Sequence, residues 1–327
     1  MITDELEKEI TTASSKINKI KSEISKRIVG QDYLIRGLLT GLFCNQHVLV
    51  EGVPGLAKTL TIKTLSDILS VDFQRIQFTP DLLPGDLIGT QIFNPSEGGF
   101  SIKKGPLFSN FILADEINRA PAKVQSALLE AMQERQITIG DETFTLAEPF
   151  IVMATQNPIE QEGTYPLPEA QVDRFMLKLK IDYPTRDEEV LILRKMAVTS
   201  VDIPVEVTLK REEIIEIRKL IDKVYIDPRV EEYIVDIMRA TRTPSEYGLD
   251  MDAYILYGAS PRALIFMTLA AKCRAFMEGR AWASPEDVQI MAPDVLRHRV
   301  VPSYEAEADG VTSEELVSRI FAKVKLP

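Results

Sequence analysis

The sequence has few cysteines, no long apolar run and no excess of positive charge. Only Cys44 and Cys273 occur in 327 residues, far apart and in apolar contexts, so neither a disulfide framework nor a cysteine metal site is expected. No run approaches the roughly 20 apolar residues of a membrane span, and Met1 to Glu9 is acidic, unlike a secretion signal. The formal net charge of −11 argues against a surface built mainly to bind nucleic acid. These absences predict a cytoplasmic globular protein of about two domains.

The clearest chemical signal is the stretch at residues 51–59, which reads EGVPGLAKT. It follows the apolar run HVLV, a predicted strand, and precedes a stretch with helical apolar spacing. A strand, a glycine-containing loop and a helix N-terminus direct backbone N–H groups at an anion. Lys58 adds a charge for the β and γ phosphates, and Thr59 offers a hydroxyl to Mg²⁺. Ala57 stands where such loops usually have glycine, but it is small enough for close approach to phosphate. A turn that merely caps a helix is the alternative.

Strands and helices alternate through the first part of the chain. Apolar or alternating runs predict five strands, at residues 47–50, 71–78, 111–116, 150–155 and 175–179. This alternation predicts an α/β fold with a parallel sheet, in which ligands bind at the carboxyl ends of strands. The glycine loop, Asp115 with Glu116, and Asn157 all follow strand ends, so we expect them to share one pocket.

Other segments fill in the domain plan. Residues 118–133 predict a helix with Pro121 near its start, and residues 136–147 predict a β-hairpin around a Gly-Asp turn. Residues 79–105 are punctuated by glycine and proline, as in a loop or hairpin insertion. From about residue 186 helical periodicity dominates. We therefore expect a nucleotide-binding core at 1–195, a linker at 196–208 and an all-helical domain at 209–327.

Three further helices carry distinctive patterns. Ser260-Pro261 and Ser284-Pro285 each place a serine N-cap before a proline at the first helical position. Residues 5–28 form an amphipathic helix whose apolar residues recur every three or four positions for about three heptads. Packing on the body of the protein is the favoured interpretation, and a partner-binding coiled coil is the alternative.

The carboxylates suggest a metal and a base. Asp115 can hold Mg²⁺ together with Thr59, and Glu116 can orient and deprotonate a water that attacks the γ phosphate. A solvated loop after a strand is the alternative for the two acids. Asn157 can position the attacking water, although asparagine also favours turns.

Two arginines are candidates for binding transferred phosphate. Arg262 lies in the first turn of a predicted helix, where a cation opposes the helix dipole unless an anion offsets the cost; a surface ion pair is the alternative. Arg174 precedes the last predicted strand and could act on a neighbouring subunit as an arginine finger. From chemistry alone it competes with Arg119, Arg135 and Arg186.

These motifs resemble those of the AAA+ ATPases, and specifically the MoxR family. The resemblance covers about residues 26–325. It is carried by the loop at 51–59, whose Ala57 is usual in that family, and by GPLF at 105–108, LADEINRAP at 113–121, VQSALLEAMQE at 124–134, MATQNP at 153–158, LPEAQVDRF at 167–175 and GASPRA at 258–263.

The resemblance implies a five-stranded AAA+ core of three αβα layers with a C-terminal helical lid. It makes Lys58 and Thr59 the Walker A pair, Asp115 and Glu116 the Walker B pair, Asn157 sensor 1, Arg174 the arginine finger and Arg262 sensor 2. Residues 79–105 correspond to the helix-2 insertion and 136–147 to the hairpin before sensor 1. The implied nucleotide-binding residues are Val29, Gly30 and Gln31 beside the adenine, and Gly52, Val53, Pro54, Gly55, Leu56, Ala57, Lys58, Thr59 and Leu60 around the phosphates.

The resemblance also implies an activity. Family members are Mg²⁺-dependent ATPases that form rings, usually hexamers, and remodel or activate protein clients, often with a partner that carries a von Willebrand factor A domain. Two other functions remain open. One is a DNA-acting AAA+ motor, which the acidic composition disfavours; the other is an assembly scaffold switched by nucleotide, with slow turnover.

Overall fold

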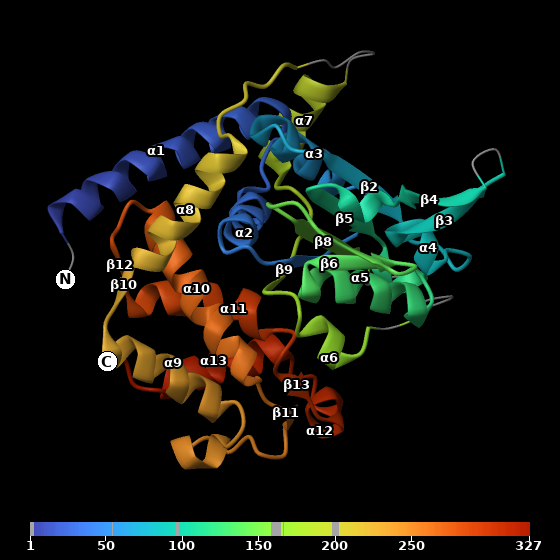
Figure 1. Ribbon diagram of the computed structural model, residues 1–327. Helices are drawn as coiled ribbons and strands as arrows, with labels where there is room; N and C mark the ends of the chain where they lie inside the picture. Colours follow the sequence, from blue (N-terminus) through green and yellow to red (C-terminus); the bar gives the residue numbers. More distant parts are fainter. Residues whose placement is uncertain (1–2, 54, 96–97, 158–164, 166, 198–202) are drawn as a thin grey trace. The chain divides into compact units, whose positions relative to one another are not determined.

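The structure is a computed structural model that describes residues 3–53, 55–95, 98–157, 165, 167–197 and 203–327. The chain divides into two compact units. We call Lys19–Arg174 with Leu179–Ile215 the sheet unit, and Met1–Asn18, Phe175–Lys178 and Glu216–Pro327 the helical unit. Figure 1 shows the elements of both.

The sheet unit is built on a five-stranded sheet with the strand order β2-β5-β8-β1-β9. The strands are β1 (Val48–Glu51), β2 (Phe73–Gln77), β5 (Phe111–Asp115), β8 (Ile151–Gln156) and β9 (Leu177–Lys180). β2 pairs with β5, β5 with β8 and β8 with β1, all in parallel. All five predicted strands and the α/β fold are thereby confirmed.

The sheet is covered by helices, which explains the continuous apolar runs of its inner strands. Val48, Leu49 and Val50 of β1 are fully buried, as are Ile112 and Leu113 of β5. A parallel strand buried on both faces has no polar face, so its sequence does not alternate. The flanking helices are α2 (Asp32–Phe43), α3 (Lys58–Leu69) and α5 (Ala122–Glu134). The short α6 (Glu169–Val172) and α7 (Arg186–Met196) complete the unit.

Two hairpins extend from this core. The segment expected as a loop or hairpin insertion contains the short helix α4 (Pro84–Ile88) and an antiparallel hairpin of β3 (Gly89–Asn94) and β4 (Gly99–Lys104). In Figure 1 this hairpin projects away from the five-stranded sheet. The second predicted hairpin is present as β6 (Gln136–Ile139) and β7 (Glu142–Thr145), which pair antiparallel.

The helix predicted at 118–133 begins later than expected. Residues Ile117–Arg119 form a single 3₁₀ turn, and α5 begins at Ala122 with Pro121 as its N-cap. Proline is tolerated at this boundary because the first helical N–H groups have no intrahelical acceptor. The residues after Glu116 are therefore used to turn the chain at the end of β5.

The N-terminal helix α1 (Asp4–Arg27) packs against the body of the protein, as the favoured interpretation predicts. Ile10, Ile17, Ile20 and Ile24 of its apolar seam are fully buried. The division of the chain differs from the expected core of 1–195, because Met1–Asn18 belongs to the helical unit. An apolar seam shows that a helix is covered, but it does not show by which part of the chain.

The helical unit contains α9 (Pro228–Ala240), α10 (Pro261–Met277), α11 (Pro285–Leu296), α12 (Tyr304–Ala308), α13 (Ser313–Lys323) and most of α8 (Arg211–Lys223). It is not all-helical, because it also has two small ladders: β10 (Tyr225–Ile226) pairs with β12 (Trp282–Ala283), and β11 (Ile255–Tyr257) with β13 (Val301–Pro302). Ser284 caps α11 through Asp287 in a reciprocal capping box. Ser260 is the N-cap residue of α10, but its side chain makes no capping hydrogen bond.

Two expectations from composition can be compared with the structure. Both cysteines are buried thiols rather than halves of a disulfide. Within the described residues, no helix combines the length and apolar character that crossing a membrane requires.

Both histidines are buried in neutral form. His47 receives a hydrogen bond on Nδ1 from the Val152 N–H at 2.9 Å, and its Nε2 lies 3.1 Å from the Met132 carbonyl, which only accepts. Burial, with a contribution from the charge of Arg135, lowers the pKa of His47 well below its ordinary value. Burial and the charge of Arg299 do the same to the pKa of His298.

We expect the free energy of unfolding to fall as the pH drops below about 6.5. The unfolded chain then binds a proton on each histidine that the folded chain excludes, which costs about 1.4 kcal/mol per pH unit for each group. Carboxylates contribute only nearer pH 4, so the window between about pH 6.5 and 5 reports on the histidines. Urea denaturation at several pH values in this window measures the slope. His47→Gln should reduce it, and an unchanged slope in that variant would contradict the assignment.

Candidate functional site

The strand ends that carry the predicted site residues are neighbours in the sheet. β5, β8 and β1 lie side by side, and their carboxyl ends are level because Ala114 pairs with Ala154 and Glu51 with Gln156. The loop after β1, the carboxylates after β5 and Asn157 after β8 therefore leave the same edge of the sheet. This is the edge at which open α/β sheets bind ligands.

The loop after β1 leads directly into α3, which begins at Lys58. The Lys58 ammonium donates to the Gly52 carbonyl at 2.6 Å and to the Val53 carbonyl at 3.3 Å. Burial lowers the pKa of Lys58, and the negative charges of Asp115 and Glu116 act in the opposite direction. The cation is thus held at the rim of the loop, within the field of the two carboxylates.

Gly52 and Gly55 are glycines for different structural reasons. A Cβ on Gly52 would lie 2.4 Å from a side-chain carbon of Ile181, so no larger residue fits there. Gly55 has a φ of 90°, which favours glycine, and faces open space. Leu56 is buried and Leu60 is half-buried, so both help to pack the loop and the first turn of α3. Pro54 lies outside the described residues.

Ala57 adopts a left-handed conformation, with φ 55° and ψ 19°. This backbone geometry explains why related loops use glycine at this position, since a Cβ is unfavourable there by about 1–2 kcal/mol. Alanine is accommodated, but it lowers the stability of the fold, because even its small side chain has a Cβ.

We expect Ala57→Gly to raise the free energy of unfolding by roughly 0.5–1 kcal/mol, the difference between relieved strain and the greater entropy of an unfolded glycine. Urea denaturation measures the change. The matched control is Ala127→Gly within α5, where the same exchange should lower stability by about 1 kcal/mol. Equal losses in both variants would show that the strain at Ala57 has no energetic weight.

Asp115 is held by residues from both neighbouring strands. Its Oδ2 accepts from Arg75 Nη2 at 2.6 Å and Nε at 3.0 Å, and its Oδ1 accepts from the Thr155 hydroxyl at 2.6 Å. Arg75 lies on β2 and Thr155 on β8. Both carboxylate oxygens therefore have fixed donors.

The Glu116 carboxylate is bonded to other side chains than those that bond Asp115. The φ of Glu116, 57°, is left-handed, and its N–H donates to the Thr155 hydroxyl at 2.9 Å. Its Oε2 accepts from Gln77 Nε2 at 2.7 Å and lies 3.3 Å from Arg119 Nε. A non-glycine residue in this conformation is strained, and such strain is concentrated at functional sites.

Sequence reasoning missed Arg75, Gln77 and Thr155. Arg75 and Gln77 are two positions apart on β2 and so face the same side of the sheet. Thr155 lies two residues before Asn157 on β8. Their position near the carboxyl end of a strand could have marked them as site residues. Which carboxylate each one bonds depends on the strand order, which the sequence does not show.

Thr59 and Asp115 fit a magnesium site by their chemistry. Hydroxyl and carboxylate oxygens suit a hard cation, and Mg²⁺ usually keeps several waters and substrate phosphate oxygens rather than a full set of protein ligands. Among the described residues there is no cluster of three or more histidine, cysteine or acidic side chains that would make a protein-only metal site. The donor set therefore suits a metal that arrives with a phosphate ligand.

Asn157 and Arg174 both belong to the sheet unit. Asn157 is buried directly after β8. Arg174 Nη1 donates to the Gln133 side-chain oxygen and, at 3.4 Å, to the Leu129 carbonyl, both on α5. These acceptors are neutral, so they hold the guanidinium less strongly than a carboxylate would.

Arg262 lies in the first turn of α10, in the helical unit, and is half-buried. The predicted position at a helix start is therefore correct. Its role toward nucleotide remains a prediction.

The segment Val29-Gly30-Gln31 forms the tight turn between α1 and α2. Gly30 and Gln31 have φ values of 68° and 60°, and a Cβ on Gly30 would lie 2.5 Å from the Glu188 carboxylate of α7. Close packing against α7 thus requires glycine at position 30.

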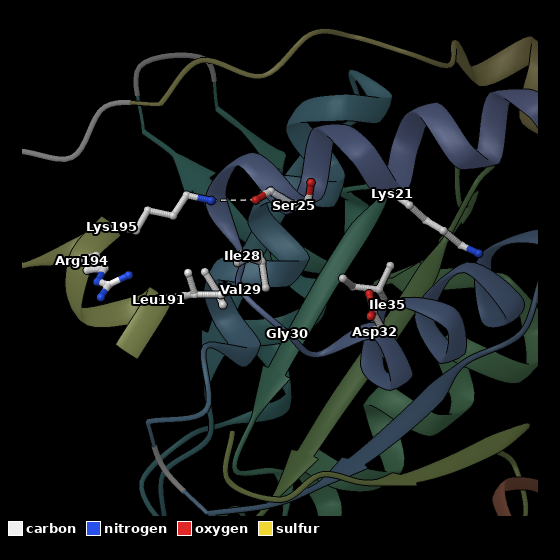
Figure 2. A pocket seen from close by; sticks show the side chains of 10 residues that line it. All are labelled: Lys21, Ser25, Ile28, Val29, Gly30, Asp32, Ile35, Leu191, Arg194 and Lys195. Atoms are coloured by element: carbon white, nitrogen blue, oxygen red, sulfur yellow. Dashed lines mark hydrogen bonds between the residues drawn. The ribbon is translucent and has the colours of Figure 1, made fainter. Parts of the chain in front are cut away.

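Val29 and Gly30 border a cavity of about 550 Å³ in the sheet unit. Figure 2 shows its walls, which come from α1, the turn, α2 and α7, with Lys195 pointing toward Ser25. The Lys195 ammonium donates to the Ser25 carbonyl at 2.6 Å. The cavity has apolar lining residues and four charged ones, of which Lys21, Arg194 and Lys195 are cationic and Asp32 is acidic.

Comparison with known proteins agrees with this geometry. The profile described as ATPase family associated with various cellular activities (AAA) matches residues 47–177, and an AAA lid domain profile matches residues 249–320. The chain is 46% identical over 306 residues to Chaperone MoxR1 of Mycobacterium tuberculosis, covering 93% of this chain and 81% of that protein. It is 31% identical over 327 residues to Protein MoxR of Methylorubrum extorquens, covering 94% of each.

A solved structure is also similar along nearly the whole chain. It is the crystal structure of a provisionally assigned ATPase from Cytophaga hutchinsonii. The two chains are 51% identical and superpose with a TM-score of 0.92, and the match covers 98% of each. The sheet order, the phosphate loop and these relatives lead to one assignment: the chain belongs to the MoxR family of AAA+ ATPases.

Proposed function

We propose that the sheet unit binds ATP with Mg²⁺ and hydrolyses it. The observation that carries this proposal is the meeting of Lys58, Asp115 and Glu116 at one edge of the sheet, after β1 and β5, which flank β8. Lys58 binds the β and γ phosphates, while Thr59 and Asp115 hold the metal. A metal bound there would supply positive charge to offset the negative charge that develops on the transferred phosphate.

Glu116 is the proposed base, because it is the second carboxylate at the end of β5 and the metal is assigned to Asp115. It orients the attacking water and accepts its proton. Gln77 and Arg119 hold Glu116 from one side. Asn157 positions the same water from the end of β8.

We propose that the adenine binds beside Val29, Gly30 and Gln31. The adjoining cavity offers an apolar surface for a base, and its lining has more cationic than acidic side chains. Arg262 contacts the γ phosphate and reports on the nucleotide state from α10.

The proposed assembly is a homo-oligomeric ring in which Arg174 acts between subunits. In a ring of six subunits each Arg174 acts on the nucleotide of its neighbour, so turnover requires assembly. The proposed work is the remodelling or activation of protein clients, together with a partner that carries a von Willebrand factor A domain. The name of the Mycobacterium tuberculosis relative, a chaperone, supports this use.

Turnover and assembly measured together test the proposal. ATP hydrolysis per subunit should rise with protein concentration over the range in which light scattering detects rings, and EDTA should abolish it. Hydrolysis that is independent of concentration would contradict action in trans. Rings that form equally with ATP and with a non-hydrolysable analogue, without measurable turnover, would favour the nucleotide-switched scaffold. Salt-dependent DNA binding that stimulates hydrolysis would favour the DNA motor.

A further inference from the structure

A buried arginine of the helical unit holds the backbone that follows Arg174. Arg299 lies just after α11 and is 4% exposed. Its Nη2 donates to the Phe175 carbonyl at 2.7 Å, and its Nη1 donates to the Met176 carbonyl at 3.2 Å. Nη1 also donates to the Val295 carbonyl in the last turn of α11. The guanidinium therefore bonds two consecutive carbonyls directly after Arg174.

His298 adds a third bond to the same backbone. Its Nε2 lies 3.1 Å from the Phe175 carbonyl. A carbonyl only accepts, so the neutral ring carries its proton on Nε2. Phe175 and Met176 are fully buried. Side chains of two successive residues thus converge on the Phe175 carbonyl.

Arg299 is an unfavourable choice if packing were the only purpose. A buried cation is costly unless its donors are satisfied, and an apolar side chain would fill the same space without that cost. The site reduces the cost in two ways, because the C-terminus of α11 favours a cation and the Phe266 ring lies 5.1 Å from the guanidinium carbon. What the guanidinium adds is direction, since its fork of N–H groups fixes the carbonyls that it bonds.

The same guanidinium touches the helix that carries Arg262. Phe266 is four residues after Arg262 on α10, so the two side chains lie on the same face one turn apart. All contacts of Arg299 described above lie within the helical unit, to which Phe175 and Met176 also belong. Arg299 therefore joins α10, α11 and the two residues that precede β9.

We propose that Arg299 is a positioning residue for Arg174. By fixing the Phe175 and Met176 carbonyls it sets where the preceding guanidinium reaches on the nucleotide of the neighbouring subunit. The helical unit, and not only the sheet, then determines the reach of Arg174. This inference rests on the proposed action of Arg174 in trans.

The first test replaces Arg299 and separates turnover from binding. Arg299→Met should lower kcat on the order of 10²-fold, the effect of misplacing a catalytic group by about 1 Å. ATP affinity should stay near the original value, because the phosphate loop of the same subunit is unaltered. Arg299→Lys keeps the charge at α11 but cannot bond both carbonyls through a fork, so it should recover only part of the turnover. Equal loss of affinity and turnover would overturn the proposal.

The decisive test mixes subunits in one ring. Arg299→Met subunits, with an intact base, are co-assembled with Glu116→Gln subunits, which lack the base but carry an intact Arg174 and Arg299. Turnover per Arg299→Met subunit should rise in the mixture, because its neighbour now supplies a correctly placed arginine. If Arg299 only supports the fold of its own subunit, the second variant will merely dilute the activity, and the proposal is wrong.

A parallel mixture distinguishes this inference from the function on which it rests. Arg174→Ala is co-assembled with Glu116→Gln in the same way. Recovery with Arg174→Ala but not with Arg299→Met would overturn the role of Arg299 alone. Recovery with neither would overturn the action of Arg174 in trans, and the present inference with it. Should Arg299→Met fail to fold, Arg299→Lys carries the same mixing experiment.

Discussion

Arg174→Ala is expected to lower ATP turnover in assembled rings on the order of 10³-fold, the low end of what an arginine finger supplies to phosphoryl transfer. ATP binding should change little, because the proposed phosphate ligands, Lys58 and its loop, belong to the same subunit and are unaltered. In the structure Arg174 is bonded to neutral oxygens of Gln133 and Leu129 on α5. It can exchange these for a charged phosphate without breaking an ion pair. Steady-state hydrolysis and fluorescent-nucleotide binding measure the two effects separately.

The structure supplies matched controls among the arginines that compete with Arg174 in the sequence. Arg186 is an exposed residue at the start of α7, paired only loosely with Asp187 at 3.7 Å, so Arg186→Ala should leave turnover unchanged. Arg135 donates to the Phe150 carbonyl and, at 2.6 Å, to the Asn45 carbonyl. Its loss should reduce stability before it reduces the rate per folded subunit. Equal turnover in assembled Arg174→Ala and unmodified rings would remove Arg174 as the finger.

The core of the fold was predictable because its signals are local. The inner strands are buried on both faces and therefore read as apolar runs, as Val48 to Val50 show. The loop at residues 51–59 is likewise a continuous segment, so its residues could be proposed as phosphate ligands without knowledge of the fold. The apolar seam of α1 predicted that the helix is buried, but the sequence did not predict which parts of the chain cover it.

What could not be predicted depends on register between distant segments. Arg75 bonds Asp115 and Gln77 bonds Glu116 only because β2 lies beside β5, with Gln77 opposite Asp115. The sequence of neither strand predicts that the other lies beside it. The two small ladders of the helical unit were missed for a different reason, since strands of two or three residues have no periodicity to detect.

Glu116→Gln is expected to lower the rate of hydrolysis on the order of 10²–10⁴-fold, the contribution of a general base in a proton transfer. The substitution keeps the size of the side chain and its capacity to hydrogen-bond Gln77, but it removes the basic oxygen. Lys58, Thr59 and Asp115 are unaltered, so the variant should still bind ATP with Mg²⁺. Rings of this variant should therefore persist in the ATP state and hold protein clients long enough for capture.

Two comparisons decide whether the effect is chemical. Glu9→Gln makes the same change of charge on an exposed position of α1 and should leave turnover unaltered. Gln77→Ala removes the hydrogen bond to Glu116 but keeps the carboxylate, so its effect should be much smaller than that of Glu116→Gln. If Glu116→Gln binds ATP and hydrolyses it at the unmodified rate, the base lies elsewhere.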